Sequence, residues 1–194
     1  ESPTLIWAEV EELFRIAKET AGGKVPILIG TGSNSTQETV EKSLKAEKLG
    51  ADGLLIVTPY YNKPPQRGLI AHYRTVAQSV KLPILLYNVP GRTAVCMTAR
   101  TIAEVATFPN VVGCKEATGD LALGKEIIDC VPSEFNLVSG DDLTFVNLGL
   151  LGGRGVISVL SNVIPADTVK LMKRARQRDE TALADFKRFE SLTQ

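Results

Sequence analysis

The sequence is poor in the residues from which most metal and nucleophilic sites are built. In 194 residues it has a single histidine, His72, and three cysteines, Cys96, Cys114 and Cys130. Catalytic zinc and iron sites usually draw on two or three imidazoles, so one histidine argues against such a site. A hydrolase with a Ser-His-Asp triad would have to use His72. The cysteines are odd in number, widely spaced and form no CxxC pair, which predicts reduced thiols rather than a disulfide framework.

An excess of one charge and long apolar runs are also absent. The 22 Lys and Arg balance the 22 Asp and Glu, which argues against a nucleic-acid or anionic-membrane surface. No apolar run approaches the ~18–20 residues that span a bilayer. The first four residues, ESPT, lack the basic and apolar regions of a signal peptide. We therefore predict a cytoplasmic protein without nucleic-acid or membrane partners.

The chain does contain a repeated alternation of apolar and amphipathic segments, within an ordinary globular composition of 44% hydrophobic and 23% charged residues. Short apolar runs predict buried strands at residues 25–30, 53–58, 83–88, 111–115, 136–140 and 155–159. Amphipathic stretches predict helices at residues 5–21, 36–49, 69–79, 98–107, 121–131 and 163–174.

Apolar strands that alternate with helices are typical of a parallel sheet covered by helices. The commonest closed form is the (β/α)8 TIM barrel of about 250 residues. Six strands are visible, and the chain opens directly into a helix. We therefore predict an α/β fold, an incomplete TIM barrel with strands 3–8 over residues 1–178. Residues 179–194 would start a C-terminal helical region, with a helix over 181–192. An open doubly wound sheet is the alternative.

Sites in such folds form beyond the carboxyl ends of the strands. Lys115 ends one predicted strand. Burying a lysine there costs free energy unless its ammonium group is paired, is neutral or has a functional role. A neutral amine attacks carbonyls to form a Schiff base. The alternative is an ordinary ion pair of Lys115 with Glu116 or Asp120. Tyr87 ends another strand and could transfer protons to an imine or simply fill the core.

Three further residues follow strand ends. Arg92 comes after a Val-Pro-Gly turn and could bind a carboxylate or phosphate, unless it is an ordinary loop arginine. Tyr60 and Tyr61 lie between proline-bearing segments, a pattern that suits an interface or a site.

Two polar turns are ambiguous. The glycine-rich turn at residues 152–155 could bind a phosphate or merely precede a strand. Asp141 and Asp142 could bind Mg²⁺, but we favour a cap for a helix that starts near Leu143.

Together these motifs resemble those of the 4-hydroxy-tetrahydrodipicolinate synthase (dihydrodipicolinate synthase) family, which belongs to the pyruvate-dependent class I aldolases and lyases. The matching segments are residues 57–64 (VTPYYNKP), 87–93 (YNVPGRT), 113–119 (GCKEATG), 139–142 (SGDD) and 155–159 (GVISV). They cover nearly the whole chain in the family's order.

The resemblance implies a lyase-type condensation of pyruvate with L-aspartate 4-semialdehyde, giving 4-hydroxy-tetrahydrodipicolinate in the diaminopimelate route to lysine. Lys115 would form the Schiff base, and Tyr87 would shuttle protons. Tyr61 would relay protons into a neighbouring subunit's site. Arg92 would hold the carboxylate of the semialdehyde. The resemblance implies no metal or other cofactor, and a homotetramer built as a dimer of dimers.

The resemblance also implies two binding regions. Backbone groups of Gly140 and Ile157 would line the pyruvate pocket. A site for lysine as feedback inhibitor would include Ser2, Trp7, Asn34, Glu38 and Tyr60.

Some features depart from the family. A Gly-Thr-Thr-Gly motif precedes the position that matches Glu1 in the family, and it is missing here together with two strands. We therefore expect a chain truncated at both ends. The alternatives are an inactive form that binds lysine, a phosphate-binding barrel enzyme, and an N-acetylneuraminate or sugar-acid lyase. Arg92 and residues 60–62 favour the synthase over those lyases.

Overall fold

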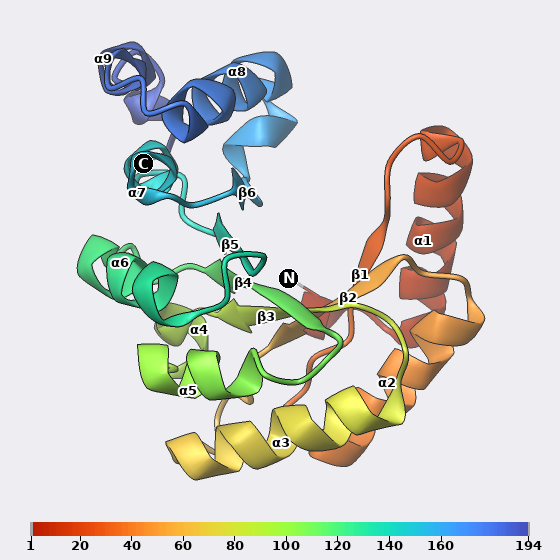
Figure 1. The fold of residues 1–194 in the computed structure, drawn as a ribbon. Coiled ribbons are helices and arrows are strands. Elements are labelled where there is room, and N and C mark those ends of the chain that lie inside the picture. Colours follow the sequence, from red (N-terminus) through yellow and green to blue (C-terminus); the bar gives the residue numbers. More distant parts are fainter. Residues whose placement is uncertain (1, 194) are drawn as a thin grey trace.

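The computed structural model describes residues 2–193 and contains one curled sheet of parallel strands. The strands are β1 (Leu28–Gly30), β2 (Gly53–Val57), β3 (Ile84–Asn88), β4 (Val111–Glu116), β5 (Asn136–Ser139) and β6 (Gly155–Val156). They are ordered as in the sequence, and every neighbouring pair is parallel. This order has no switch point of the kind that defines a doubly wound sheet. The predicted incomplete barrel is therefore confirmed, with helices around the outside and an open side between β1 and β6 (Figure 1).

The helices are α1 (Trp7–Ala21), α2 (Thr36–Lys48), α3 (Gln66–Ser79), α4 (Pro90–Thr93), α5 (Ala99–Val105), α6 (Leu121–Cys130), α7 (Phe145–Leu151), α8 (Pro165–Arg176) and α9 (Thr181–Phe186). Helices and strands alternate, except that α4 and α5 both lie between β3 and β4 and that α8 and α9 both follow β6. Three short 3-10 helices are η1 (Ser2–Thr4), η2 (Leu160–Asn162) and η3 (Glu190–Thr193). Several starts are set by local chemistry. Ser35 caps α2, Asp120 caps α6, and Pro165 occupies the first turn of α8.

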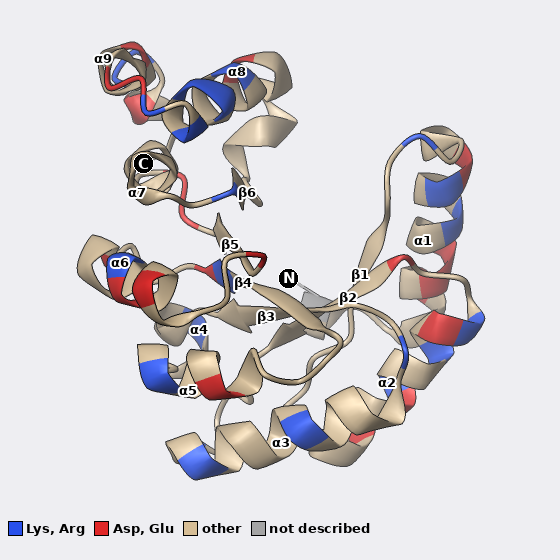
Figure 2. Ribbon diagram, in the orientation of Figure 1, with Lys and Arg blue, Asp and Glu red and all other residues tan. Residues whose placement is uncertain are grey.

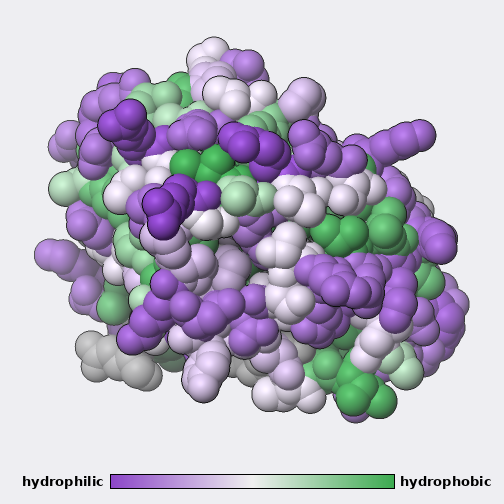
Figure 3. Space-filling view, turned by 90° about the horizontal axis from the view of Figure 1, so that it is seen from below, coloured by the Kyte–Doolittle hydropathy of each residue, from purple (hydrophilic) through white to green (hydrophobic). Residues whose placement is uncertain are grey.

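The main core lies between the sheet and the helices around it. Leu54, Ile56, Ile84 and Leu86 of β2 and β3 are fully buried within it. Charged residues of both signs lie mostly on the helices and loops (Figure 2). Seen from the side of α3, hydrophilic residues separate small hydrophobic patches (Figure 3). Among the described helices, none is long and apolar enough to cross a membrane.

A second core joins the last three helices. Phe145 of α7 and Phe186 of α9 meet edge to face, with ring centroids 5.3 Å apart. Leu171 and Met172 of α8 belong to the same cluster. Arg174 of α8 adds ion pairs to α9 and the turn before it. The segment after residue 178 therefore packs directly onto the end of the barrel.

Three predicted elements are reduced to half their length or less. The predicted strand 25–30 is a strand only at Leu28–Gly30. The predicted strand 155–159 is a strand only at Gly155–Val156, because the N–H groups of Val159 and Leu160 donate to Asp142 Oδ2 and turn the chain into η2. The predicted helix 181–192 breaks after Phe186, and a 3-10 turn follows.

Candidate functional site

Lys115 and Tyr87 lie side by side at the carboxyl ends of β4 and β3. They are partners in the register of the sheet. Lys115 Nζ lies 4.0 Å from the centroid of the Tyr87 ring. Both side chains are half-buried. The structure thus brings together the amine and the phenol that the sequence analysis named as candidates for imine chemistry.

Gly140, at the end of β5, makes room for the lysine. A Cβ on Gly140 would come within 2.6 Å of Lys115 Cε and 2.8 Å of Ala117 Cβ, closer than real Cβ contacts allow. A larger residue at this position would force the Lys115 side chain or Ala117 to move.

The pyruvate pocket inferred from the resemblance included backbone groups of Gly140 and Ile157. The Gly140 N–H donates to Glu116 O, and the Ile157 N–H donates to Ser139 O. Both N–H groups are therefore used within the sheet and cannot also bind a ligand. The carbonyl groups of the two residues are the backbone atoms that remain for a substrate.

Arg92 lies in α4, a single turn that directly follows β3. Pro90 occupies the first position of this turn, and the Arg92 N–H donates to Val89 O. The arginine side chain is exposed, and no ion pair engages it among residues 2–193. It is thus available to an anion near the end of β3.

Tyr61 projects from a tight loop after β2. Tyr61 is 88% exposed, and its φ of 72° lies in the left-handed region that disfavours side chains with a Cβ. Asn62 holds the loop by donating to Asn34 O, which joins it to the loop after β1. Strain in an exposed aromatic loop is typical of a functional segment.

Three of the residues assigned to a lysine site share one groove. Trp7, Glu38 and Tyr60 line it, and its volume is about 360 Å³. Lys42 also lines the groove, and its Nζ lies 2.7 Å from Glu38 Oε1. Asn34 is not among the lining residues, and the side chain of Ser2 is outside the described part of the chain.

The two aspartates after β5 bind backbone and hydroxyl groups. Asp141 Oδ2 accepts from the N–H and Oγ1 of Thr144, directly before α7. Asp142 Oδ2 accepts from the N–H groups that open η2. Both carboxylates thus accept hydrogen bonds just before a helix, as the favoured interpretation expects. The N-cap residue of α7 is nevertheless Thr144 rather than an aspartate, and Asp142 serves η2 instead. Within residues 2–193 no cluster of metal-ligating side chains is present.

The glycine-rich turn at residues 152–155 ends α7. Its first three N–H groups donate to Gly149 O, Leu148 O and Leu137 O. A phosphate would have no free N–H groups at these positions, so the phosphate-binding hypothesis is wrong for this turn.

His72 is buried on α3. Its Nδ1 lies 2.9 Å from Thr36 Oγ1, and its Nε2 has no hydrogen-bond partner among the described residues. Burial lowers the pKa of His72 to about 4. A buried imidazole bound to a threonine does not make a catalytic triad.

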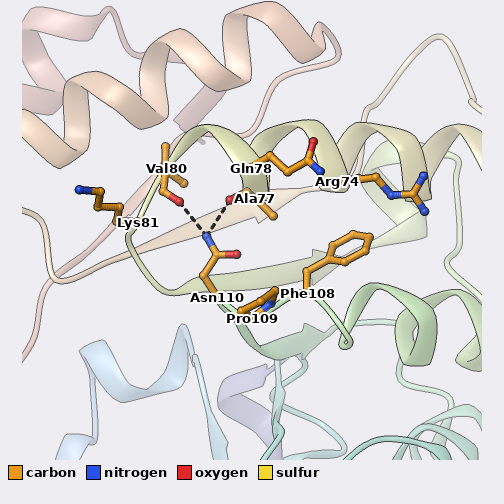
Figure 4. A pocket seen from close by; sticks show the side chains of 8 residues that line it. All are labelled: Arg74, Ala77, Gln78, Val80, Lys81, Phe108, Pro109 and Asn110. Atoms are coloured by element: carbon orange, nitrogen blue, oxygen red, sulfur yellow. Dashed lines mark hydrogen bonds between the residues drawn. The ribbon is translucent and has the colours of Figure 1, made fainter.

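A larger groove, of about 520 Å³, lies between α3 and the loop that leads into β4, at the opposite ends of the strands (Figure 4). Asn110 points its amide at the end of α3 and donates to the carbonyls of Ala77, in its last turn, and of Val80, directly after it. Arg74 lies over the Phe108 ring at 5.6 Å. The polar groups here hold α3 against the start of β4.

Sequence reasoning missed one pair of polar residues near the site. Asn88 and Glu116 follow Tyr87 and Lys115 on their strands, are buried, and bind each other. A glutamate after a strand-end lysine suggests an exposed ion pair in the sequence. Its burial depends instead on the loops around Met97 and Thr118, whose N–H groups bind the pair.

The curled parallel sheet, with an amine–phenol pair at its carboxyl edge, defines an incomplete β/α barrel. The chain belongs to the Dihydrodipicolinate synthetase family, whose model matches residues 1–193. This confirms the resemblance found in the motifs.

Individual relatives agree with this assignment. The 4-hydroxy-tetrahydrodipicolinate synthase of Bdellovibrio bacteriovorus is 50% identical over 193 residues, which are 99% of this chain and 66% of that protein. The crystal structure of the chloride-inhibited dihydrodipicolinate synthase of Acinetobacter baumannii complexed with pyruvate has a TM-score of 0.96, 41% identity, and coverage of 100% of this chain and 67% of that one. The enzyme of Cyanidioschyzon merolae with lysine bound has a TM-score of 0.94, 43% identity, and coverage of 99% and 66%. The chain thus spans about two thirds of the length of these relatives.

Proposed function

We propose that this chain carries the imine-forming core of a 4-hydroxy-tetrahydrodipicolinate synthase. The observation that carries the proposal is Lys115 Nζ, 4.0 Å from the Tyr87 ring, in the space left by Gly140. The relatives named above support it, and one of their structures is described as complexed with pyruvate.

The chemistry starts at Lys115. Its neutral amine attacks the C2 carbonyl of pyruvate, and the carbinolamine loses water to give an imine. Loss of a methyl proton gives an enamine, whose carbon attacks the aldehyde of L-aspartate 4-semialdehyde. The amino group of the semialdehyde then attacks the imine carbon, closes the ring and releases Lys115. Tyr87 gives and takes the protons of the carbinolamine steps.

Other residues bind the substrates or reach a neighbouring subunit. Arg92 pairs with the carboxylate of the semialdehyde, because its guanidinium is exposed beside the end of β3. The carbonyls of Gly140 and Ile157 face the bound pyruvate. Tyr61, exposed on its strained loop, reaches the site of a neighbouring subunit in a homotetramer.

Borohydride trapping tests the imine. With pyruvate, we expect the mass of the chain to rise by one pyruvic acid less one oxygen atom, with the adduct on the peptide that contains Lys115. Lys115→Ala should give no adduct. Lys125→Ala, which removes only an exposed ion pair with Asp129, should keep it. Absence of an adduct on a chain that circular dichroism shows to be folded contradicts the proposal.

The aldehyde partner separates the synthase from the lyases. Aspartate 4-semialdehyde should deplete the trapped imine, and N-acetylmannosamine should leave it unchanged. The opposite result would favour an N-acetylneuraminate lyase.

A second proposal concerns lysine binding in the groove lined by Trp7, Glu38 and Tyr60, which the lysine-bound relative supports. Lys42 already contacts the Glu38 carboxylate, so the ammonium of a bound lysine must displace it. Calorimetry should show tighter lysine binding for Lys42→Ala and weaker binding for Glu38→Gln. Failure of wild type and Lys42→Ala alike to bind lysine contradicts this site.

A further inference from the structure

A buried polar pair lies directly behind the amine–phenol pair. Asn88 and Glu116 are the next register partners after Tyr87 and Lys115. Successive residues of a strand point to opposite faces of the sheet. Asn88 is fully buried, and Glu116 is 4% exposed. Burying a carboxylate costs free energy unless each of its oxygens accepts a hydrogen bond. The burial of this pair therefore calls for a structural or functional explanation.

Each polar atom of the pair has a specific partner. Asn88 Nδ2 donates to Glu116 Oε2 at 2.8 Å, and the Thr118 N–H donates to Glu116 Oε1 at 2.6 Å. The Met97 N–H donates to Asn88 Oδ1 at 2.9 Å. Because Met97 needs an acceptor, the Asn88 amide cannot turn over. Glu116 therefore faces two N–H donors, and the arrangement calls for a carboxylate.

The backbone extends this network to three strands. The Ala117 N–H donates to Asn88 O at 2.9 Å, and the Gly140 N–H donates to Glu116 O at 2.7 Å. Gly140 is the residue that lies against the Lys115 side chain. Burial raises the pKa of the Glu116 carboxyl, and its two N–H donors oppose that shift.

We propose that Asn88 and Glu116 are positioning residues that hold Lys115 beside Tyr87 through their buried hydrogen-bonded pair. The proposal rests on the proposed imine chemistry of Lys115. The pair fixes the ends of β3 and β4 on the face opposite the site, and it ties both to Gly140. A misplacement of about 1 Å at a reacting group can cost about 100-fold in rate, so this constraint matters to the reaction.

The hydrogen-bond pattern allows a matched set of variants. In Glu116→Gln, one amide N–H must face either Asn88 Nδ2 or the Thr118 N–H, which are both donors. In Asn88→Asp, a carboxylate faces a carboxylate. The double variant restores the bond within the pair and both bonds to the backbone, and it loses only the long contact from Asn88 Nδ2 to Cys96 Sγ. The carboxylate introduced by Asn88→Asp accepts from the Met97 N–H and from the new glutamine amide, whose oxygen still accepts from the Thr118 N–H. Glu104→Gln, an exposed change on α5, is the control.

Two measurements distinguish an effect on the position of Lys115 from an effect on the stability of the fold. The first is the maximal rate of imine formation, trapped by reduction at varied pyruvate concentration. We expect each single variant to lose about 10-fold or more, with little change in the half-saturating pyruvate concentration, and the double variant to recover to within about 3-fold of wild type. The second is the nuclear Overhauser contact between the Lys115 methylenes and the Tyr87 ring, which should weaken in the single variants and return in the double variant.

Several outcomes would overturn the proposal. Folded single variants that melt earlier yet react at the wild-type rate would make the pair purely structural. A double variant as slow as the single variants would refute the hydrogen-bond argument. If wild type forms no imine, the proposed function fails, while the Overhauser contact still decides whether the pair positions Lys115.

Discussion

At the scale of single residues, the tightest constraint near the proposed site is the space at Gly140. Gly140→Ala places a Cβ 2.6 Å from Lys115 Cε, so the lysine must move away from Tyr87. We expect imine trapping to slow by about 10-fold or more and stability to fall by about 1–3 kcal/mol. Mass spectrometry of the trapped adduct measures the first effect, and chemical denaturation measures the second.

Gly91→Ala is the matched control, because a Cβ there has no neighbour within 4 Å. It should trap pyruvate at the wild-type rate. Equal rates for Gly140→Ala and wild type would show that the lysine needs no such space.

His72 makes folding depend on pH. Its folded pKa of about 4 lies below the usual value of about 6.5, so the folded chain binds the proton less readily than the unfolded chain. The stabilisation from this group is complete above about pH 6.5 and is lost as the pH falls toward 4, by up to about 3 kcal/mol. Denaturation curves at about pH 7 and pH 4 should show a smaller loss for His72→Gln than for wild type. Identical losses would assign the acid sensitivity to other groups.

The sequence predicts the placement of residues well where they break a local pattern. Lys115 and Tyr87 interrupt apolar strands at their ends, and the structure brings them together. The roles of Asn88 and Glu116 could not be predicted in this way. Their burial depends on the loops around Met97 and Thr118, which the strand pattern does not describe.

At the scale of elements, alternating apolar and amphipathic segments were enough to predict the order of strands and helices. The ends of elements depended on single side chains. The last strand is short because the Val159 N–H donates to the Asp142 carboxylate and the chain turns away from the sheet. The single turn α4 escaped prediction, since four residues are too few for a periodic pattern.

The cap at Asp142 gives a prediction at this scale. Asp142→Ala removes the acceptor for the first N–H groups of η2 and should cost about 1–2 kcal/mol. Thermal melting measures the loss. Because the carboxylate already serves backbone donors, Mg²⁺ should not raise the melting temperature of wild type. A rise with Mg²⁺ that disappears in Asp142→Ala would restore the metal hypothesis.

At the scale of the whole molecule, the curled sheet has two edges, β1 and β6, that pair on one side only among the described residues. Apolar side chains lie exposed near them, with Leu28 at 44% and Val159 at 77%. Unpaired strand edges are templates for pairing with another chain. Open-ended pairing of this kind differs from the closed homotetramer proposed above, because it grows with concentration without reaching a fixed size.

We therefore expect the 194-residue chain to associate with rising concentration in sedimentation experiments. Leu28→Lys should weaken this association, because a lysine on an edge strand opposes pairing with another strand. Leu44→Lys is the matched control, since Leu44 is 37% exposed but lies on α2 rather than on an edge. A single species at all concentrations, or equal effects of the two substitutions, would show that the edges of this sheet do not recruit further chains.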